Sequence, residues 1–196
     1  RGKRFFILVI LINEVYLWLN KMLKNVIGLM SGTSMDGVDA AYLKTNGIDF
    51  IETGMAITLP YSDSFRNELS EVVSKGLYSK NVEYQITNIH ADAVKHLIEK
   101  NGDSRGFVDL IGFSGHTIFH IPDEKKTLQI GDGALLADLT GIDVVSDFRS
   151  TDLINGGQGA PLAPVYHQVL ATKLKKPVGI INIGGVANIT YIGTED

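Results

Sequence analysis

Two similar strand–turn–strand units, a whole domain apart, constrain the fold of this chain most. The first consists of an apolar run, a turn rich in Gly, Ser, Thr and Asp, and a return run, at 26–30, 31–37 and 38–43. The second has apolar runs at 178–183 and 187–192 around Gly184 and Gly185. Short apolar runs bounded by turn residues are typical of β-hairpins. A hairpin that recurs one domain later indicates a duplicated domain.

The segment between the two hairpins alternates strand and helix patterns. It predicts a strand at 48–58, helices at about 62–74 and 82–100, a strand at 108–113, a helix at 133–139, a strand at 142–145, a loop at 146–161 and a helix at 164–174. Helical spacing of apolar residues and capping residues support the helices. The fold class is therefore α/β, with a first domain at 22–176 and the start of a second at 177–196, cut after its first hairpin.

Residues 1–21 form an extra N-terminal segment with three cations followed by an eight-residue apolar run, Phe5 to Ile12. A run of this length is too short to span a bilayer as a helix, which needs ~20 apolar residues. We interpret the segment as lying upstream of a native start at Met22, with a stray apolar strand or helix as the alternative. At its other end the chain stops at Asp196, just after a strand-like run, which predicts a fragment.

Composition excludes several classes of function. The chain has no Cys, so disulfides, Cys-ligated metals and Cys nucleophiles are ruled out. A formal net charge of −4 argues against a nucleic-acid-binding protein, because that task needs a basic face. We expect a cytoplasmic enzyme with no membrane or nucleic-acid partner.

The first turn has the chemistry of an anion cradle. Its glycines let backbone N–H groups converge on a phosphate, and Thr33 and Ser34 add hydroxyl donors. Asp36 beside an anion makes sense if a divalent cation lies between the carboxylate and the phosphates. A Walker A motif is absent. The alternative is a purely structural turn, which the recurrence of a second such turn disfavours.

The loop at 146–161 is the second candidate site. It follows an apolar strand, and ligands in α/β sheets bind beyond the carboxyl ends of strands. It holds two carboxylates that flank Arg149, together with Gln158 and three glycines that would let a ligand approach the backbone. A local ion pair of Arg149 with Asp147 or Asp152 is the alternative interpretation. His116 and His120 lack the helical spacing of a zinc site, so we interpret them as structural or substrate-lining residues.

Five motifs together resemble the anhydro-N-acetylmuramic acid kinase family. They are MSGTSMDGVDAAY at 30–42, TLQIGDGALLA at 127–137, GIDVVSDFR at 141–149, GGQGAPLAP at 156–164 and NIGGVANIT at 182–190. The resemblance covers about 25–192. It implies a duplicated actin/hexokinase-like (ribonuclease H-like) domain around an ATP cleft. It also implies ATP and Mg²⁺ as cofactors and an amino sugar, 1,6-anhydro-N-acetylmuramic acid, as substrate.

The resemblance also assigns roles to residues. It implies a first phosphate loop made of Gly32, Thr33, Ser34, Met35, Asp36, Gly37, Val38 and Asp39, and a second made of Gly184 and Gly185. Asp36 is the metal candidate, and the substrate candidates are Thr117, Arg149, Asp152 and Gln158. Arg149 is expected to pair with the lactyl carboxylate of the sugar in bidentate fashion.

Two departures from the family pattern bear on function. The family's Gly-x-His-Gly-Gln-Thr segment reads Gly-Phe-Ser-Gly-His-Thr here, with Ser114 for the His and His116 for the Gln. The Asp that the family uses as general base belongs to a motif beyond Asp196, so this chain alone is expected to be inactive. Two alternatives stay open: a same-fold kinase for another sugar or acid, and a non-catalytic ligand-binding half-kinase. A homodimer also stays open.

Overall fold

The computed structural model describes residues 23–101, 108–183 and 187–194. Its centre is a six-stranded mixed sheet in the order β3-β2-β1-β4-β5, with β6 also paired to β4. The strands are β1 (Lys24–Ser31), β2 (Gly37–Thr45), β3 (Ile51–Pro60), β4 (Leu110–Ile121), β5 (Lys126–Ile130) and β6 (Val144–Ser146). β1 is antiparallel to β2 and parallel to β4. The α/β fold class predicted from the sequence is confirmed.

The first hairpin forms where the sequence predicts it, but β3 starts three residues later than expected, at Ile51 rather than Ile48. The side chain of Asn46 explains the difference. Its Oδ1 accepts the backbone N–H groups of Ile48, Asp49 and Phe50 and so holds these residues in a loop. An Asn side chain that competes for backbone donors in this way opposes strand formation locally.

β4 is much longer than the predicted strand at 108–113, and β5 was not predicted at all. Gly115 bends β4 at a positive φ of 66°. Before this bend β4 pairs in parallel with β6, and after it β4 pairs antiparallel with β5. The turn-like Ser-Gly pair misled the sequence interpretation, because a strand can cross such a bend when it finds a new partner strand. A short 3₁₀ helix, η1 (Pro122–Glu124), links β4 to β5.

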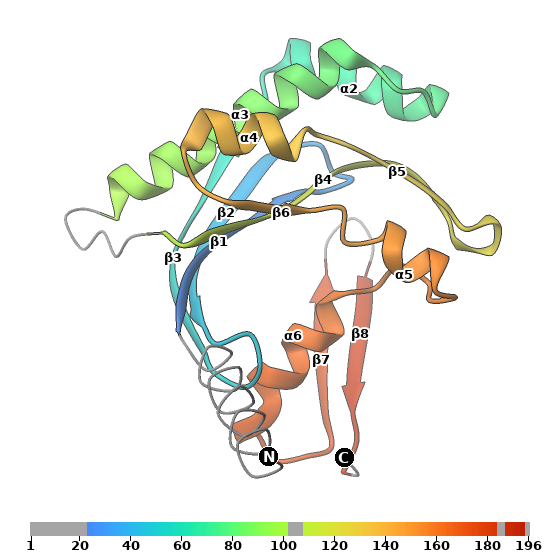
Figure 1. Ribbon diagram of the computed structural model, residues 1–196. Coiled ribbons are helices and arrows are strands. Elements are labelled where there is room, and N and C mark those ends of the chain that lie inside the picture. Colours follow the sequence, from blue (N-terminus) through green and yellow to red (C-terminus); the bar gives the residue numbers. More distant parts are fainter. Residues whose placement is uncertain (1–22, 102–107, 184–186, 195–196) are drawn as a thin grey trace, which may run out of the picture.

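Three helices cover one face of the sheet and bury the core (Figure 1). They are α2 (Asp63–Lys75), α3 (Lys80–Lys100) and α4 (Gly133–Thr140). Each helix is capped at its N-terminus by a side chain that accepts a backbone N–H of the first turn. The capping residues are Ser62 for α2, Ser79 for α3 and Asp132 for α4. Fully buried residues of β1, β2, β4 and α3 form the centre of this core: Ile27, Val38, Ala40, Ile86, Val94 and Ile111.

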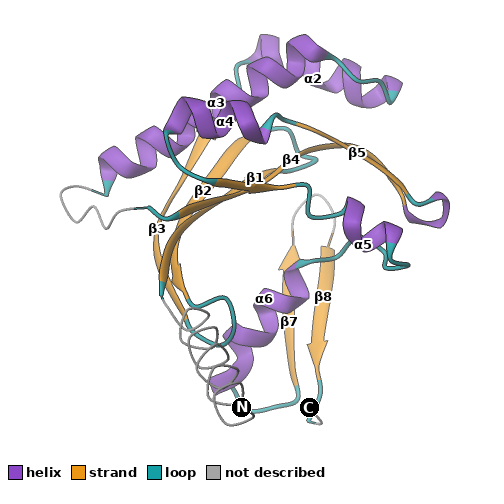
Figure 2. Ribbon diagram, viewed as in Figure 1, coloured by secondary structure: helices purple, strands orange, loops and turns teal. Residues whose placement is uncertain are grey.

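The remaining elements lie on the other side of the sheet (Figure 2). They are α5 (Ser150–Ile154), α6 (Ala163–Leu170), the 3₁₀ helix η2 (Ala171–Lys173), β7 (Val178–Ile183) and β8 (Ala187–Ile192). The predicted loop at 146–161 thus contains a helical turn, α5, and the helix predicted at 164–174 ends in a 3₁₀ turn. β7 and β8 pair only with each other, as the predicted second hairpin requires.

Three expectations remain untested by the fold. The segment 1–21 lies outside the described residues, and the domain boundary near Lys176 and the duplication stay predictions. Among the helices of the described part of the chain, none is both long and apolar enough to cross a membrane.

Candidate functional site

The turn between β1 and β2 presents free donors to the surface. Thr33 and Ser34 are exposed at its tip. The backbone N–H of Met35 donates to the carbonyl of Gly32 at 3.0 Å, and Met35 itself has a positive φ of 51°. The N–H groups of Thr33 and Ser34 have no protein acceptor among the described residues. Two free N–H groups and two hydroxyls on one exposed turn are suited to bind an anion.

Asp36 adds an ionised carboxylate to this turn. Ser34 Oγ donates to Asp36 Oδ1 at 2.8 Å. This hydrogen bond is the main cause that lowers the pKa of Asp36, with the backbone N–H groups of Asp36 and Gly37 adding to it. The described residues contain no cluster of three or more side chains that could hold a metal alone. Mg²⁺ commonly takes one or two carboxylates and completes its shell with phosphate oxygens and water. Asp36 could therefore be one ligand of a Mg²⁺ ion whose other ligands are phosphate oxygens and water.

The exit of the turn is anchored by the start of α2. The backbone N–H of Tyr61 donates to the carbonyl of Asp36 at 3.0 Å. Arg66 Nε donates to the carbonyl of Met35, also at 3.0 Å. These two bonds give the carbonyls of Met35 and Asp36 partners within the protein and hold the exit of the turn in place.

The entrance of the turn is anchored by a buried contact. Ser31 Oγ lies 2.6 Å from Tyr61 Oη and 2.8 Å from His116 Nδ1. His116 and Tyr61 are 1% and 4% exposed, respectively. Burial raises the pKa of Tyr61 to about 12, so its hydroxyl keeps its proton. Tyr61 thus holds both ends of the turn, one through its side chain and the other through its backbone.

The last three residues of the predicted first phosphate loop, Gly37, Val38 and Asp39, lie in β2 and differ in exposure. A Cβ on Gly37 would lie 2.4 Å from the carbonyl oxygen of Leu59, so only glycine allows the two strands to meet here. Val38 is fully buried, which leaves only its backbone for any ligand. Asp39 is exposed and accepts a hydrogen bond from Thr58 Oγ1 at 2.5 Å. Gly184 and Gly185, the predicted second phosphate loop, lie outside the described residues.

The candidate substrate loop is closed by its own carboxylates. Asp152 Oδ2 accepts the backbone N–H of Gly159 at 2.7 Å. Asp147 Oδ1 accepts the hydroxyl of Ser150 at 2.6 Å. The guanidinium of Arg149 makes no hydrogen bond or ion pair within the described residues. The alternative in which Arg149 pairs with Asp147 or Asp152 is therefore not supported, and Arg149 remains available to a ligand.

The glycines of this loop serve packing more than access, contrary to the sequence interpretation. A Cβ on Gly157 would lie 2.2 Å from the carboxylate of Asp152. A Cβ on Gly159 would lie between 3.1 and 3.3 Å from Leu153, His120 and Arg149. Only Gly156 faces open space. Close approach of the loop to its own side chains requires two of the three glycines.

His120 and Gln129 tie the loop and the strands together. His120 Nε2 donates to the carbonyl of Gln158 at 2.9 Å, since a carbonyl can only accept. Gln129 Nε2 donates to Thr117 Oγ1 at 3.1 Å. The interpretation of His120 as a structural or substrate-lining residue agrees with this contact. The carbonyl of Gln158 thus accepts a hydrogen bond, while its side chain makes none to the described residues.

A polar pocket of about 250 Å³ opens where β4 exchanges its partner strand. Its lining includes hydroxyl and amide side chains and the carboxylate that precedes α5: Ser114, Thr127, Gln129, Ser146, Asp147 and Ser150. Ser114, one of the two substitutions in the family's Gly-x-His-Gly-Gln-Thr segment, therefore lies at a pocket. None of the four predicted substrate residues lines it, although Arg149 lies between two that do.

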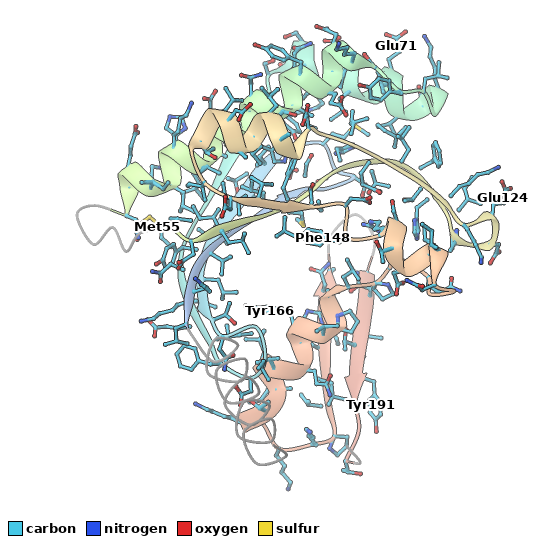
Figure 3. The ribbon with its side chains drawn as sticks, viewed as in Figure 1. Met55, Glu71, Glu124, Phe148, Tyr166 and Tyr191 are labelled. Atoms are coloured by element: carbon cyan, nitrogen blue, oxygen red, sulfur yellow. The ribbon has the colours of Figure 1, made fainter. Side chains whose placement is uncertain are left out.

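A larger, mostly apolar groove of about 810 Å³ lies on the face of the sheet that α2, α3 and α4 leave open. Phe148, two residues after β6, and Tyr166 on α6 border it (Figure 3). Asp39 and Met30, beside the phosphate turn, border the same groove. The groove thus brings the edge of the turn and the start of the candidate substrate loop to one surface.

Sequence reasoning missed the two residues that hold the turn, Tyr61 and Arg66. Tyr61 is 30 positions from Ser31, and Arg66 is 31 positions from Met35. Nothing in the local pattern links them to the turn. The only available signal was an aromatic residue directly after Pro60, shortly beyond the strand predicted at 48–58.

Comparison with known proteins gives a consistent result. A model of the anhydro-N-acetylmuramic acid kinase family matches residues 24–196. A protein of that name from Paramagnetospirillum magneticum is 49% identical over 86% of this chain and 48% of its own length. Namesakes from Rhizobium etli and Brucella canis are 44% and 46% identical, over 89% and 88% of this chain and 50% of their own lengths. The chain spans about half the length of these curated relatives.

Proposed function

The chain belongs to the anhydro-N-acetylmuramic acid kinase family, and on that premise we propose that it supplies the phosphate-binding half of an ATP-dependent sugar kinase. The proposed substrate is 1,6-anhydro-N-acetylmuramic acid, and the proposed product is N-acetylmuramic acid 6-phosphate, formed in cell-wall recycling. One observation supports this most directly. The turn between β1 and β2 combines free N–H groups, hydroxyls and an ionised Asp36, and both of its ends are held.

The reaction joins hydrolysis to phosphoryl transfer. Water adds to the anomeric carbon while the bond from that carbon to O6 breaks, and O6 takes the γ-phosphoryl group of ATP, releasing ADP. The proton of the attacking water goes to a general base, which we assign to no residue of this chain. The proposed role of this chain is to bind and orient the phosphates, since phosphoryl transfer depends mainly on positioning and charge stabilisation.

Each part of the turn has a role in this proposal. The N–H groups of Thr33 and Ser34 donate to phosphate oxygens, and their hydroxyls add two further donors. Asp36 would hold Mg²⁺, which supplies charge neutralisation on the phosphates. The lowered pKa of Asp36 keeps its carboxylate ionised, as a cation ligand must be.

Arg149 is the proposed contact for the lactyl carboxylate of the sugar. Its guanidinium has no partner within the described residues, while both neighbouring carboxylates are bonded elsewhere. Thr117, Asp152 and Gln158 stay proposed substrate residues. The Asp152 carboxylate has one oxygen, Oδ1, left for a sugar hydroxyl once Oδ2 holds Gly159.

The wider architecture is also proposed. The order β3-β2-β1-β4 with β1 parallel to β4 supports an actin/hexokinase-like (ribonuclease H-like) domain. In this proposal β7 and β8 begin its second copy. We propose a cytoplasmic location, with ATP and one amino sugar as partners, and a homodimer as the oligomeric state to test.

A chimeric protein tests the proposal. Residues 24–196 would replace the segment they match in the Paramagnetospirillum magneticum relative. We expect ATP-dependent formation of N-acetylmuramic acid 6-phosphate, measured by mass spectrometry, and its loss in the Asp36→Asn chimera. A folded chimera, checked by cooperative thermal unfolding, that forms no product from this sugar would contradict the proposal. Phosphorylation of a different sugar instead would favour the kinase of altered specificity that Ser114 suggests.

A further inference from the structure

Two Asn-Gly pairs lie wholly within the described residues, and both reach solvent; a third, at 101–102, lies partly outside them. Asn46-Gly47 lies between β2 and β3, and Asn155-Gly156 follows α5. Asn46 is partly exposed, and the other three residues are exposed. An asparagine before glycine can lose its side-chain amide, because the glycine nitrogen can bond to the asparagine Cγ without hindrance from a side chain. Both pairs are therefore candidates for this reaction.

The side chain of Asn46 is held by four hydrogen bonds. Its Oδ1 accepts the backbone N–H groups of residues 48–50 at distances between 3.0 and 3.1 Å. Its Nδ2 donates to Asp49 Oδ1 at 2.7 Å. The N–H of Gly47, whose nitrogen would have to attack, donates to Thr45 Oγ1 at 3.0 Å. Ring closure has to turn the Asn46 Cγ toward the Gly47 nitrogen, so these bonds must break first.

The side chain of Asn155 is held by a single hydrogen bond. Its Nδ2 donates to the carbonyl of Thr151 at 2.8 Å, and its Oδ1 accepts no donor from the described residues. The N–H of Gly156 donates to the carbonyl of Leu153 at 3.2 Å. Both bonds belong to the end of α5, a helix of only five residues. Helix ends fray at little cost in free energy, so the Asn155 side chain is easily released.

Hydrogen bonding, and not space, distinguishes the two pairs. A Cβ on Gly47 or on Gly156 would meet nothing within 4 Å, so both glycines have room around them. Both also have a positive φ, 73° for Gly47 and 93° for Gly156. The Asn46 side chain must give up three more hydrogen bonds than that of Asn155 before the ring can close. The fold therefore opposes the reaction much more strongly at Asn46.

We propose that Asn155 is a site of spontaneous deamidation and that the fold protects Asn46 from the same reaction. The Gly156 nitrogen loses its proton to hydroxide and bonds to the Asn155 Cγ. The bond from Cγ to Nδ2 breaks, and the amide nitrogen takes a proton from water and leaves as ammonia. Water then opens the cyclic imide. Addition of water at Cγ gives aspartate, whereas addition at the backbone carbonyl carbon gives isoaspartate, in which the chain runs through Cβ and Cγ.

Both products change the loop that follows α5. Each adds a negative charge to a loop that already holds the carboxylates of Asp147 and Asp152. Isoaspartate also adds one carbon to the backbone between Asp152 and Gly159, whose hydrogen bond of 2.7 Å closes the loop. The bond from the N–H of Gly157 to the Asp152 carbonyl, at 2.8 Å, spans the same added carbon. The isoaspartate form should therefore hold the loop closed less well.

Peptide mapping by mass spectrometry tests the site in the chain as it stands. Trypsin places the two pairs on separate peptides, 45–66 and 150–173. After incubation at 37 °C and pH 8, we expect Asn155 to deamidate at least about tenfold faster than Asn46, because each additional hydrogen bond slows opening several-fold. In urea, where the fold is lost, the two rates should converge. Similar rates in the folded chain, or an equal difference that persists in urea, would overturn the proposal.

Melting temperatures test the effect on the loop. Asn155→Asp carries the added charge on a normal backbone, and Asn155→Gln reacts slowly because its ring would be larger. We expect the aged chain to melt at least ~2 °C below the fresh chain and also below Asn155→Asp, while Asn155→Gln should not change on ageing. A chain that mapping shows to be deamidated at Asn155, and that melts as the fresh chain does, would overturn this effect. No measurement here needs ATP or sugar, so failure of the proposed function would leave the result unchanged.

Discussion

Asp152 Oδ2 accepts the backbone N–H of Gly159 at 2.7 Å, across seven positions of the chain. This bond folds the glycine-rich segment back onto α5. Because Asp152 is bonded to Gly159, it does not pair with Arg149 at the start of α5. The loop that the sequence predicts as a ligand site is thus a closed structure, in which the guanidinium of Arg149 has no partner among the described residues.

We expect Asp152→Ala to lower the free energy of unfolding by about 1–2 kcal/mol, because it leaves the Gly159 N–H without its acceptor. Asp152→Asn should cost less than half as much, since an amide oxygen can still accept. Urea denaturation of the chain measures both. Asp138→Ala, which removes an exposed carboxylate from α4, is the control and should change little. Equal stability of the Asp152→Ala and Asp138→Ala variants would contradict this role.

Gly115 should tolerate no side chain, whereas Gly28 should. A Cβ on Gly115 would lie 2.6 Å from the Ile130 carbonyl oxygen, at a φ of +66°, while a Cβ on Gly28 meets nothing within 4 Å. We expect Gly115→Ala to destabilise the chain by at least ~2 kcal/mol and Gly28→Ala to be neutral or slightly stabilising. Melting temperatures of the two variants provide the comparison, and similar values would show that the bend in β4 adapts.

Asp36→Asn should reduce kcat in the chimeric kinase by orders of magnitude without changing its stability. The side chain is exposed, and its hydrogen-bond partners within the described residues, Ser34 and the backbone of the turn, are local, so we expect the fold to tolerate loss of its charge. Loss of a cation ligand beside the phosphates affects the transition state most. Steady-state kinetics at saturating Mg²⁺, with Asp138→Asn as control, give the test. An unchanged kcat would show that Asp36 only helps to form the turn.

Arg149→Lys should distinguish recognition of an anion from shaping of the loop. A bidentate contact to the lactyl carboxylate is lost with Lys, which can only offer a point charge. We expect a higher KM for the lactyl sugar and little change for an analogue without the carboxylate. Both are measured in the chimeric kinase. Equal effects on both substrates would argue against direct contact.

Stability should fall as the pH is lowered from about 7 to about 4. Burial lowers the pKa of His90 from 6.5 to about 4 and lowers that of His116 as well. Between these values the unfolded chain binds protons that the folded chain does not, so acid favours unfolding; the contribution of His90 reaches about 3 kcal/mol. Urea denaturation at pH 7.5, 6 and 5 measures the slope. In His90→Leu the slope should flatten, and an unaltered slope would exclude His90 as its source.

The sequence by itself determined the local elements of this protein and the chemistry of its first turn. Apolar runs bounded by turn residues located β1, β2, β7 and β8, and Ser62 marked the start of α2. These features depend on neighbouring residues alone, because turn conformations and helix caps are set within a few positions. The five motifs also carried the family resemblance, which the comparisons confirm.

Only the tertiary structure decided how that turn is held and how β4 continues. Ser31 meets His116 across 85 positions, and Tyr61 meets Ser31 across 30. β4 runs on past Gly115 because β5 offers it a new partner strand, which no local pattern shows. Residues that share a buried contact from distant parts of the chain carry no common periodicity. Their pairing follows from burial, where each polar atom must find whichever partner the packed sheet and helices bring within reach.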